Sequence, residues 1–223
     1  MSPVISSMNT TPLKTCGPGR PKDLEKRAAI LQAAKNLFPE NGFDGTSMDA
    51  IAAMAGVSKL TVYSHFTDKE TLFTEAVREK CSEQMPNELF VANLSGSLRD
   101  QLLAIARAFF ALVTSEESIA LHRLLTTGVG SSTKLAQRFW EAGPQTLQGE
   151  FAGFLSREVE AGLLDINDIK RAASQFFCLL KGEMHARQLC GCSELVCTQA
   201  DIDQHLEATV DLFIRAYRPQ KIG

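Results

Sequence analysis

The sequence has no long apolar run. Its longest apolar stretch, from Leu102 to Val113, is interrupted by Arg107 and is shorter than the ~20 residues that a membrane-spanning helix needs. The opening stretch, MSPVISSMNTTPLKT, lacks the apolar core and the charged start of a secretion signal. We therefore predict a cytoplasmic protein that has no membrane partner.

Cysteine and tyrosine are both scarce. Six cysteines in 223 residues are too few for a disulfide framework, and we interpret them as thiols. The chain has only two tyrosines, and its β-branched residues seldom alternate with polar ones, so the usual signals of strands are missing. The predicted fold class is all-α.

The short motifs of common enzyme classes are missing as well. The sequence contains no GxSxG, no glycine-rich phosphate loop, no HExxH and no pair of carboxylates set apart by its context. It therefore predicts no catalytic residue and no cofactor.

Neither sign of charge dominates. The 23 basic and 26 acidic residues give a net charge of -3, whereas a domain that binds nucleic acid mainly by electrostatics is usually strongly basic. Residues 1–85 hold ten basic and ten acidic residues, residues 86–223 hold thirteen and sixteen, and positive charge gathers between Lys14 and Arg27. The acidic balance therefore belongs to the second part of the chain.

Helix signals divide the chain into three parts. Residues 1–22 are rich in Ser, Thr, Pro and Gly and end in basic residues, which predicts a flexible basic arm. Residues 23–84 predict a small domain of short helices, in which Gly42 ends the first helix and Thr46, Ser58 and Thr67 begin the next three. Residues 85–223 predict a larger helical domain, with helices over 97–115, 116–127, 133–141, 145–161, 168–189 and 201–217.

The segment from Ser47 to Phe66 has the spacing of a helix-turn-helix. Ala52 is small where the next helix crosses it, Gly56 allows the tight turn, and Val62 is a buried wedge. The outward face of the second helix carries hydroxyls, a lysine, a histidine and an aromatic ring but no acid, which suits the DNA major groove. The alternative, a packing unit with a polar surface, would need the spacing, the caps and the acid-free face to coincide.

Candidate DNA contacts lie on this helix and beside it. Leu60 or the Thr61 methyl group can touch a thymine methyl group, and hydroxyls and lysines can bond phosphates or base edges. Thr46 and Ser47 lie at the predicted start of the preceding helix, where the positive end of the dipole favours phosphate. The full set is Thr46, Ser47, Lys59, Leu60, Thr61, Tyr63, Ser64, His65 and Lys69.

Several short motifs between residues 19 and 73 together form a known pattern. They include Gly19-Arg20-Pro21, Thr46-Ser47-Met48, Ala55-Gly56-Val57-Ser58-Lys59, Tyr63-x-His65-Phe66 and Lys69-Glu70-x-Leu72-Phe73. With these motifs, residues 20–84 resemble the N-terminal domain of the TetR/AcrR family of bacterial transcriptional regulators. The resemblance implies a homodimeric, ligand-responsive repressor that binds a palindromic operator of double-stranded DNA. It adds Ser58 as a phosphate contact and Arg20 as a minor-groove arm, for which a solvated charge is an equal alternative.

Two apolar stripes in the last helices offer a dimer surface. They recur every three or four residues, so two such helices could pair with their symmetry mates as a four-helix bundle. The alternative is that both stripes pack inside one subunit. The candidate interface residues are Ile169, Ala173, Phe176, Leu180, Ile202, Leu206, Thr209 and Phe213.

The resemblance places an effector pocket among the middle helices, and their aromatic side chains suit a small apolar or aromatic effector. Packing in the core is the alternative for most of these residues. The candidates are Phe109, Phe110, His122, Trp140, Phe151, Phe154 and Phe177. Gly143-Pro144 and the segment from Asp211 to Tyr217 resemble the AefR-like subgroup of C-terminal domains.

Three cysteines near the end of the chain raise an alternative mode of control. Cys190, Cys192 and Cys197 follow Cys178 and His185, and such soft ligands could bind a metal or act as a redox switch. Their spacing is not a paired C-x2-C pattern, so an incidental thiol cluster is the competing interpretation. A helical protein-binding adaptor without DNA binding is a further alternative, which the acid-free face argues against.

Overall fold

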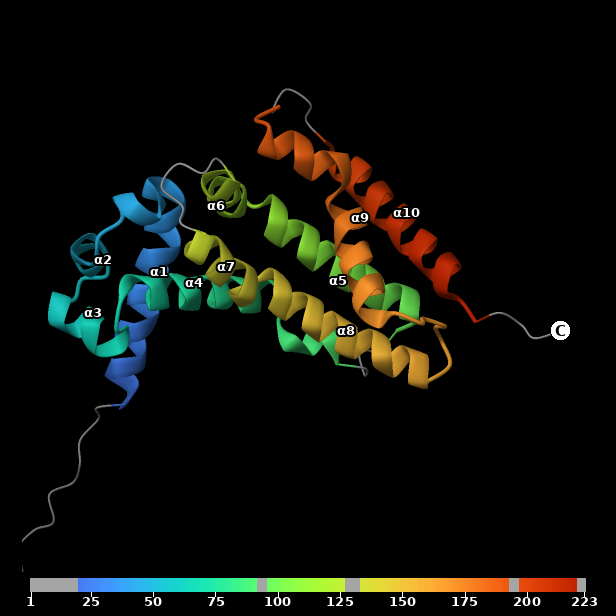
Figure 1. The fold of residues 1–223 in the computed structure, drawn as a ribbon, viewed down its shortest axis with the longest axis horizontal. Coiled ribbons are helices and arrows are strands. Elements are labelled where there is room, and N and C mark those ends of the chain that lie inside the picture. Colours follow the sequence, from blue (N-terminus) through green and yellow to red (C-terminus); the bar gives the residue numbers. More distant parts are fainter. Residues whose placement is uncertain (1–19, 92–95, 127–132, 193–196, 220–223) are drawn as a thin grey trace, which may run out of the picture.

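The computed structural model describes residues 20–91, 96–126, 133–192 and 197–219, and only the backbone of residues 20–22. Every regular element in these ranges is a helix, which confirms the predicted all-α class (Figure 1). The elements are α1 (Arg20–Gly45), α2 (Met48–Met54), α3 (Lys59–His65), α4 (Lys69–Gln84), the short 3-10 helix η1 (Asn87–Phe90), α5 (Leu98–Thr114), α6 (Glu116–Thr126), α7 (Thr133–Ala142), α8 (Pro144–Glu160), α9 (Ile169–Leu189) and α10 (Gln199–Tyr217).

The first helices differ slightly from the predicted boundaries. Helix α1 begins at Arg20, three residues before the predicted start at residue 23, and it kinks at Gly42, where φ is 72°. Glycine tolerates this left-handed conformation, so a short further turn follows the kink. The N-cap of α2 is Ser47 instead of Thr46, and that of α4 is Asp68, one residue after the predicted position.

Helices α1 to α4 enclose the first hydrophobic core. The predicted wedge residue Val62 is buried there together with Ile51 and Phe66, and Gly56 has a φ of 66°, as the tight turn requires. Ser58 caps α3 through its hydroxyl, as predicted. Figure 1 shows α2 and α3 at one end of the molecule, away from α9 and α10.

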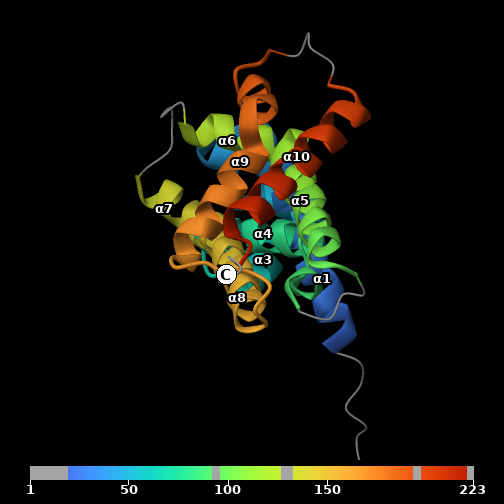
Figure 2. The ribbon, with the colours of Figure 1, turned by 90° about the vertical axis from the view of Figure 1, so that its right-hand side faces the viewer.

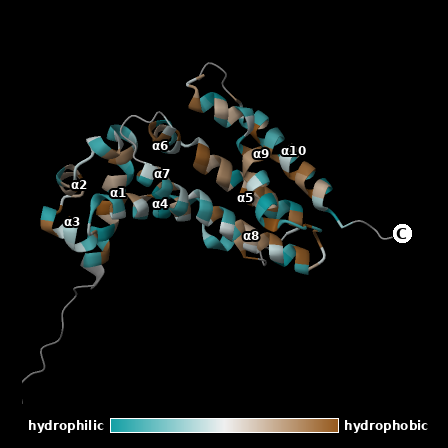
Figure 3. Ribbon diagram, in the orientation of Figure 1, coloured by the Kyte–Doolittle hydropathy of each residue, from teal (hydrophilic) through white to brown (hydrophobic). Residues whose placement is uncertain are grey.

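A second core lies between η1, α5, α8, α9 and α10. Phenylalanines dominate it, and the rings of Phe151 and Phe176 stack with centroids 4.8 Å apart. Figure 2, in which the end formed by α9 and α10 faces the viewer, shows these two helices beside α5. Most helices carry hydrophilic and hydrophobic residues side by side (Figure 3), as amphipathic helices around a core do.

Helices α6 and α7 connect the two cores. Helix α6 packs on α1, and α7 packs on α4 and α8. Leu135 and Ala142 of α7 are buried in the first core, although α7 follows α5 and α6 in the chain. Within the described ranges, no helix combines the length and the apolar character needed to cross a bilayer.

Candidate DNA-binding surface and effector cavity

Helix α3 presents most of its side chains to solvent. Val62 is its only buried residue, and it anchors α3 against the first core. On the opposite side, Leu60 is 80% exposed and Tyr63 is 44% exposed, and both Lys59 and Ser64 are exposed. A helix that is held by one buried residue and is exposed elsewhere can enter a DNA groove with little rearrangement.

The polar groups of this face are organised by local bonds. The Ser58 hydroxyl accepts from the Thr61 amide at 3.1 Å, and the two hydroxyls lie 2.8 Å apart. Ser64 donates to the Thr61 carbonyl at 2.7 Å. Lys59 lies 2.9 Å from Asp49 of α2, and the hydrogen bond to this carboxylate raises the pKa of Lys59. Lys59 is therefore a cation at the surface, and its present partner is itself exposed.

Thr46 is the first correction to the predicted DNA contacts. Thr46 is only 1% exposed, and its hydroxyl lies 2.7 Å from the Gly42 carbonyl and 3.1 Å from the Leu37 carbonyl. The kink at Gly42 leaves carbonyl groups without their helical partners, and the Thr46 hydroxyl donates to them. Thr46 therefore holds the end of α1, and Ser47 is the exposed hydroxyl at the start of α2.

Lys69 and His65 are also used inside the domain. Lys69 donates to the carbonyls of Phe43 at 2.7 Å and Thr46 at 3.0 Å, and its ammonium lies 4.3 Å from the centre of the Phe43 ring. The His65 side chain is only 10% exposed, and its Nε2 lies 3.1 Å from a carboxylate oxygen of Asp23 on α1. Both side chains stabilise contacts between helices, so neither is free on the surface that α3 presents.

The other predicted contacts lie on the surface, except for Arg20, whose position cannot be compared. The side chain of Arg20 is not described, so its predicted role in the minor groove stays a prediction. The residues that keep a surface position are Ser47, Ser58, Lys59, Leu60, Thr61, Tyr63 and Ser64. We call these seven residues the reading surface.

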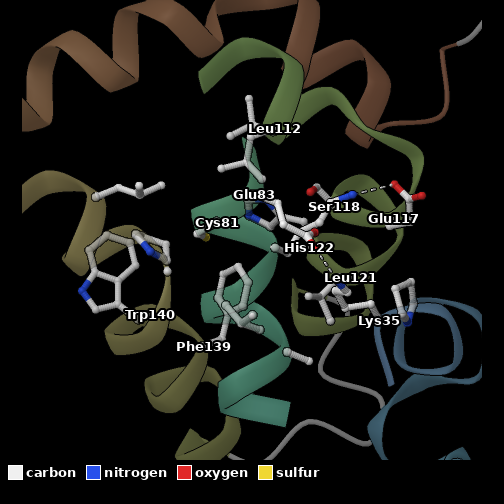
Figure 4. Close-up of a pocket in the computed structure, with 18 of the residues that line it drawn as sticks. Lys35, Cys81, Glu83, Leu112, Glu117, Ser118, Leu121, His122, Phe139 and Trp140 are labelled. Atoms are coloured by element: carbon white, nitrogen blue, oxygen red, sulfur yellow. Dashed lines mark hydrogen bonds and ion pairs between the residues drawn. The ribbon is translucent and has the colours of Figure 1, made fainter. Parts of the chain in front are cut away.

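A cavity of about 350 Å³ lies between the two cores. Four of the candidate pocket residues line it, namely Phe109, His122, Trp140 and Phe177. Figure 4 shows His122 and Trp140 on this wall. Other residues of the wall were not predicted. Several of them lie on helices of the first domain, and the sequence of such a helix does not show that it contacts the second domain. The wall residues that were not predicted include Lys35 and Asn36 of α1, Val77, Lys80 and Cys81 of α4, Leu112 of α5, Leu121 of α6, Phe139 of α7, Gln148 of α8, and Cys178 and Lys181 of α9.

Three predicted pocket residues belong to the packed core instead. Phe151 and Phe154 are completely buried and stack with centroids 5.8 Å apart. Phe110 is also buried, with its ring 6.2 Å from that of His205. These side chains extend from α5 and α8 toward the second core, on faces of the helices that do not line the cavity. For them the alternative interpretation as core residues is correct.

Two ion pairs join neighbouring helices in the wall of the cavity. Lys35 of α1 lies 2.6 Å from Glu83 of α4, and Lys80 of α4 lies 3.6 Å from Glu117 of α6. The Cys81 thiol is partly buried and lines the same cavity, and burial raises its pKa to about 11. Cys81 is therefore a neutral, weakly polar part of the wall.

Two histidines lie side by side between α6 and α9, and one of them, His122, lines the cavity. The rings of His122 and His185 have centroids 5.6 Å apart. Burial, and then the charge of Lys181, lower the pKa of both rings, and that of His185 falls to about 4. Both rings are therefore neutral at neutral pH.

The predicted dimer stripe is buried within the subunit. Six of its members lie in the second core: Ala173, Phe176, Leu180, Leu206, Thr209 and Phe213. Ile169 and Ile202 are partly buried and pack against the same core. The alternative, that both stripes pack inside one subunit, is therefore correct, because α9 and α10 are needed to close the core over α5 and α8. On these two helices, Leu179 is 43% exposed and Leu212 is 48% exposed.

The cysteines do not form a metal cage in the described part of the chain. Cys190, Cys192 and Cys197 are exposed thiols, and Cys178 lies on the cavity wall. Among the described residues, no group of three or more His, Cys, Asp or Glu side chains could hold a metal ion.

Two family models together match most of the chain. Residues 30–76 match the model for bacterial regulatory proteins of the tetR family. Residues 100–219 match the model for the C-terminal domain of AefR-like transcriptional repressors. Both resemblances found in the sequence are therefore confirmed.

Individual relatives agree with these matches. The uncharacterized HTH-type transcriptional regulator YdeS of Bacillus subtilis is 31% identical over 153 residues, which are 67% of this chain and 72% of YdeS. A TetR-family regulator from Mesorhizobium loti is 30% identical with a TM-score of 0.72, over 89% of this chain and 99% of the other. The flavonoid-responsive regulator FrrA is 35% identical with a TM-score of 0.69, over 87% and 98% of the two chains. The reading surface, the cavity between the cores and these matches lead to one conclusion, that the chain belongs to the TetR family of bacterial transcriptional regulators.

Proposed function

We propose that this ligand-responsive DNA-binding regulator is a homodimeric repressor that leaves a palindromic operator when a small aromatic molecule fills the cavity. The observation that carries the proposal is the reading surface, in which one short helix exposes Leu60 and Tyr63 while Val62 anchors it. The match to AefR-like repressors supports repression. The relatives are regulators of transcription, and we propose no catalytic activity for this chain.

The reading surface suits both phosphate and base contacts. Lys59 can exchange its exposed partner Asp49 for a phosphate, since an exposed ion pair contributes little stability. Leu60 offers an apolar contact to a thymine methyl group, and the hydroxyl of Tyr63 can bond a base edge or a phosphate. With few cationic side chains on this surface, we expect operator binding to depend only modestly on salt.

The cavity is a suitable effector site because it borders both cores. Residues of α1 and α4 form one side, and residues of α5, α6 and α9 form the other. Its volume of about 350 Å³ falls within the range of small-molecule sites. Aromatic rings line it, and the relative FrrA is described as flavonoid-responsive. We propose a small, flat, apolar or aromatic effector, whose binding changes the position of α1 and α4 and hence of α3.

Two copies of the chain are needed to read a palindrome. One helix-turn-helix offers too few contacts for tight and selective binding, and two-fold symmetry places a second helix about one turn of DNA away, at ~34 Å. We propose that the exposed side of α9 and α10, with Leu179 and Leu212, forms the dimer interface in place of the buried stripe. The regulator acts where its DNA is, in the cytoplasm.

The decisive experiment measures binding to the DNA upstream of the protein's own gene by gel shift. We expect Tyr63→Ala and Lys59→Ala to weaken binding by at least about fivefold, because each removes about 1–3 kcal/mol of contact with DNA. Lys170→Ala, an exposed lysine of α9, is the matched control and should bind like the wild type.

The dimer should persist in both variants, as measured by light scattering during gel filtration. If both variants bind the DNA as tightly as the wild type does, α3 is not the recognition helix and the proposal is wrong.

A further inference from the structure

The three lysines that line the cavity differ in their partners. Lys35 pairs with Glu83, and Lys80 pairs with Glu117. Lys181 of α9 also lines the cavity, but it has no ion-pair partner among the residues that the structure describes. Its positive charge is therefore not balanced by any described carboxylate of the wall.

The groups around Lys181 add no negative charge. His122 of α6 and His185 of α9 are close enough for its charge to lower the pKa of both rings, and both are neutral at neutral pH. The nearby Glu183 is bonded to Arg187 on the same helix. The corner of the cavity formed by α6 and α9 is therefore positive.

A second observation at the same corner points to a missing polar partner. His185 is 95% buried, since only 5% of its surface is exposed, and its Nε2 forms no hydrogen bond with any described residue. Buried polar atoms in folded proteins are normally paired. His122 lies beside this ring and itself lines the cavity, so the wall offers the Lys181 cation and the His122 imidazole next to an apolar space, with the unpaired Nε2 of His185 directly behind them.

We propose that the cavity selects a flat aromatic molecule that carries an anionic oxygen, either a carboxylate or an ionised phenol. Lys181 pairs with this oxygen, and the neutral ring of His122 donates its N–H to it. The rings of Phe109, Phe177 and Trp140 contact the aromatic part. An anion is favoured because a partly buried cation loses water on ligand binding and needs a partner of opposite charge. This inference rests on the proposed role of the cavity as the effector site.

The fluorescence of the single tryptophan can be used to follow binding in the cavity. Trp140 is the only tryptophan in the chain and is 47% exposed, so saturable quenching of its fluorescence, as opposed to the linear quenching by a probe in solution, reports binding in the cavity. Affinities are measured by calorimetry at pH 8 with two matched pairs of probes. Cinnamate and cinnamamide test the carboxylate, and 4-nitrophenolate and 4-nitroanisole test the ionised phenol.

We expect at least one anion to bind the wild type about tenfold more tightly than its neutral partner, which equals about 1.4 kcal/mol. Lys181→Met should abolish this preference and leave the affinity for the neutral probe unchanged. Lys181→Glu should reverse the preference, which provides a second test if the methionine variant folds poorly. Lys170→Met, on an exposed position of α9 outside the cavity, should behave like the wild type. The pair that shows the preference identifies which oxygen group the cavity selects.

Two results would contradict the inference, and they are distinguishable. Equal affinities within both pairs, with Trp140 quenched, would retain the cavity as a ligand site but overturn its preference for anions. A preference that persists in Lys181→Met would overturn the role of this lysine in the same way. If no probe quenches Trp140 or gives heat, the proposed role of the cavity fails together with the inference.

Discussion

Polar side chains near α3 are of two kinds: some form hydrogen bonds inside the domain, and others remain exposed on its surface. Thr46 and Lys69 donate to backbone carbonyls at the end of α1, so both are engaged in bonds within the domain. Ser47 and Ser58 bond an amide at the start of their own helices, and their hydroxyls remain exposed. The first two residues secure the junction of α1 with α2, and the other two keep α2 and α3 in place at the surface.

His185 makes stability depend on pH. Its pKa is about 4 in the folded chain against 6.5 for the unperturbed ring, so the unfolded chain binds a proton first as the pH falls. Above pH 6.5 the ring is neutral in both states, and the protein has its full stability. Between pH 6.5 and about 4 the unfolded chain takes up the proton and the folded chain does not, so the free energy of unfolding decreases. The full loss is on the order of 3 kcal/mol, from about 1.4 kcal/mol per pKa unit.

Urea denaturation of the wild type and of His185→Gln should reveal this effect. We expect the variant to lose less stability than the wild type between pH 7 and pH 5, because glutamine takes up no proton. A measurement at pH 7.5, where the ring is neutral in both states, supplies the baseline for each protein. Parallel curves for the two proteins would show that His185 does not contribute to the acid sensitivity.

Helix α7 belongs to both halves of the molecule. Its residue Leu135 is buried in the first core, while Phe139 and Trp140 of the same helix line the cavity. Glu70 at the start of α4 lies 3.0 Å from Arg138 of α7. Movement of α7 on effector binding would therefore reach α4 directly, through packing and through this ion pair.

Helix α9 contains a kink that its sequence explains only in part. Gly182 has a φ of 51°, and a β-carbon there would lie 2.9 Å from the ring of His205. The Nε2 of His205 donates to the Leu180 carbonyl at 2.9 Å, next to the kink. The kink therefore depends both on a residue that tolerates positive φ and on a side chain from α10.

Gly182→Ala should destabilise the protein by about 1–3 kcal/mol, because alanine is strained at positive φ and its methyl group displaces His205. Gly149→Ala is the matched control, since Gly149 lies inside α8 with nothing near its β-carbon position and should gain about 0.5–1 kcal/mol. Chemical denaturation gives both values. In a His205→Ala background the cost of Gly182→Ala should fall, and an unchanged cost would mean that the close approach does not matter.

At the scale of the whole molecule, the described residues form two cores, with a cavity between them that both help to form. Most of the large apolar side chains of α9 and α10 are used to close the second core, and this leaves only a few for contact with another subunit. A dimer interface on these helices must therefore use the exposed leucines, Leu179 and Leu212, with polar residues around them.

Leu179→Glu combined with Leu212→Glu should convert the dimer to a monomer, because two charges from each subunit would be buried at the two-fold interface. Operator affinity should fall with it, since each monomer reads only half a palindrome. Analytical ultracentrifugation measures the mass, and a gel shift measures the affinity. Val91→Glu, an equally exposed apolar position at the end of η1, is the control and should remain dimeric. A double variant that stays dimeric would exclude these helices as the interface.

The sequence by itself determined the helical class, the helix-turn-helix and the family, because caps, turn glycines and helical spacing depend on neighbours within one or two turns. Ser58, Gly56 and Val62 have the roles that this local pattern predicts. Only the tertiary structure decided which apolar face is core and which polar group is free. The sequence pattern around Phe213 fits a dimer interface as well as a core. The position of Thr46 fits a phosphate contact as well as a hydrogen bond that holds the end of a helix. The choice depends on what other segments bring within bonding distance, and a linear pattern does not contain that distance.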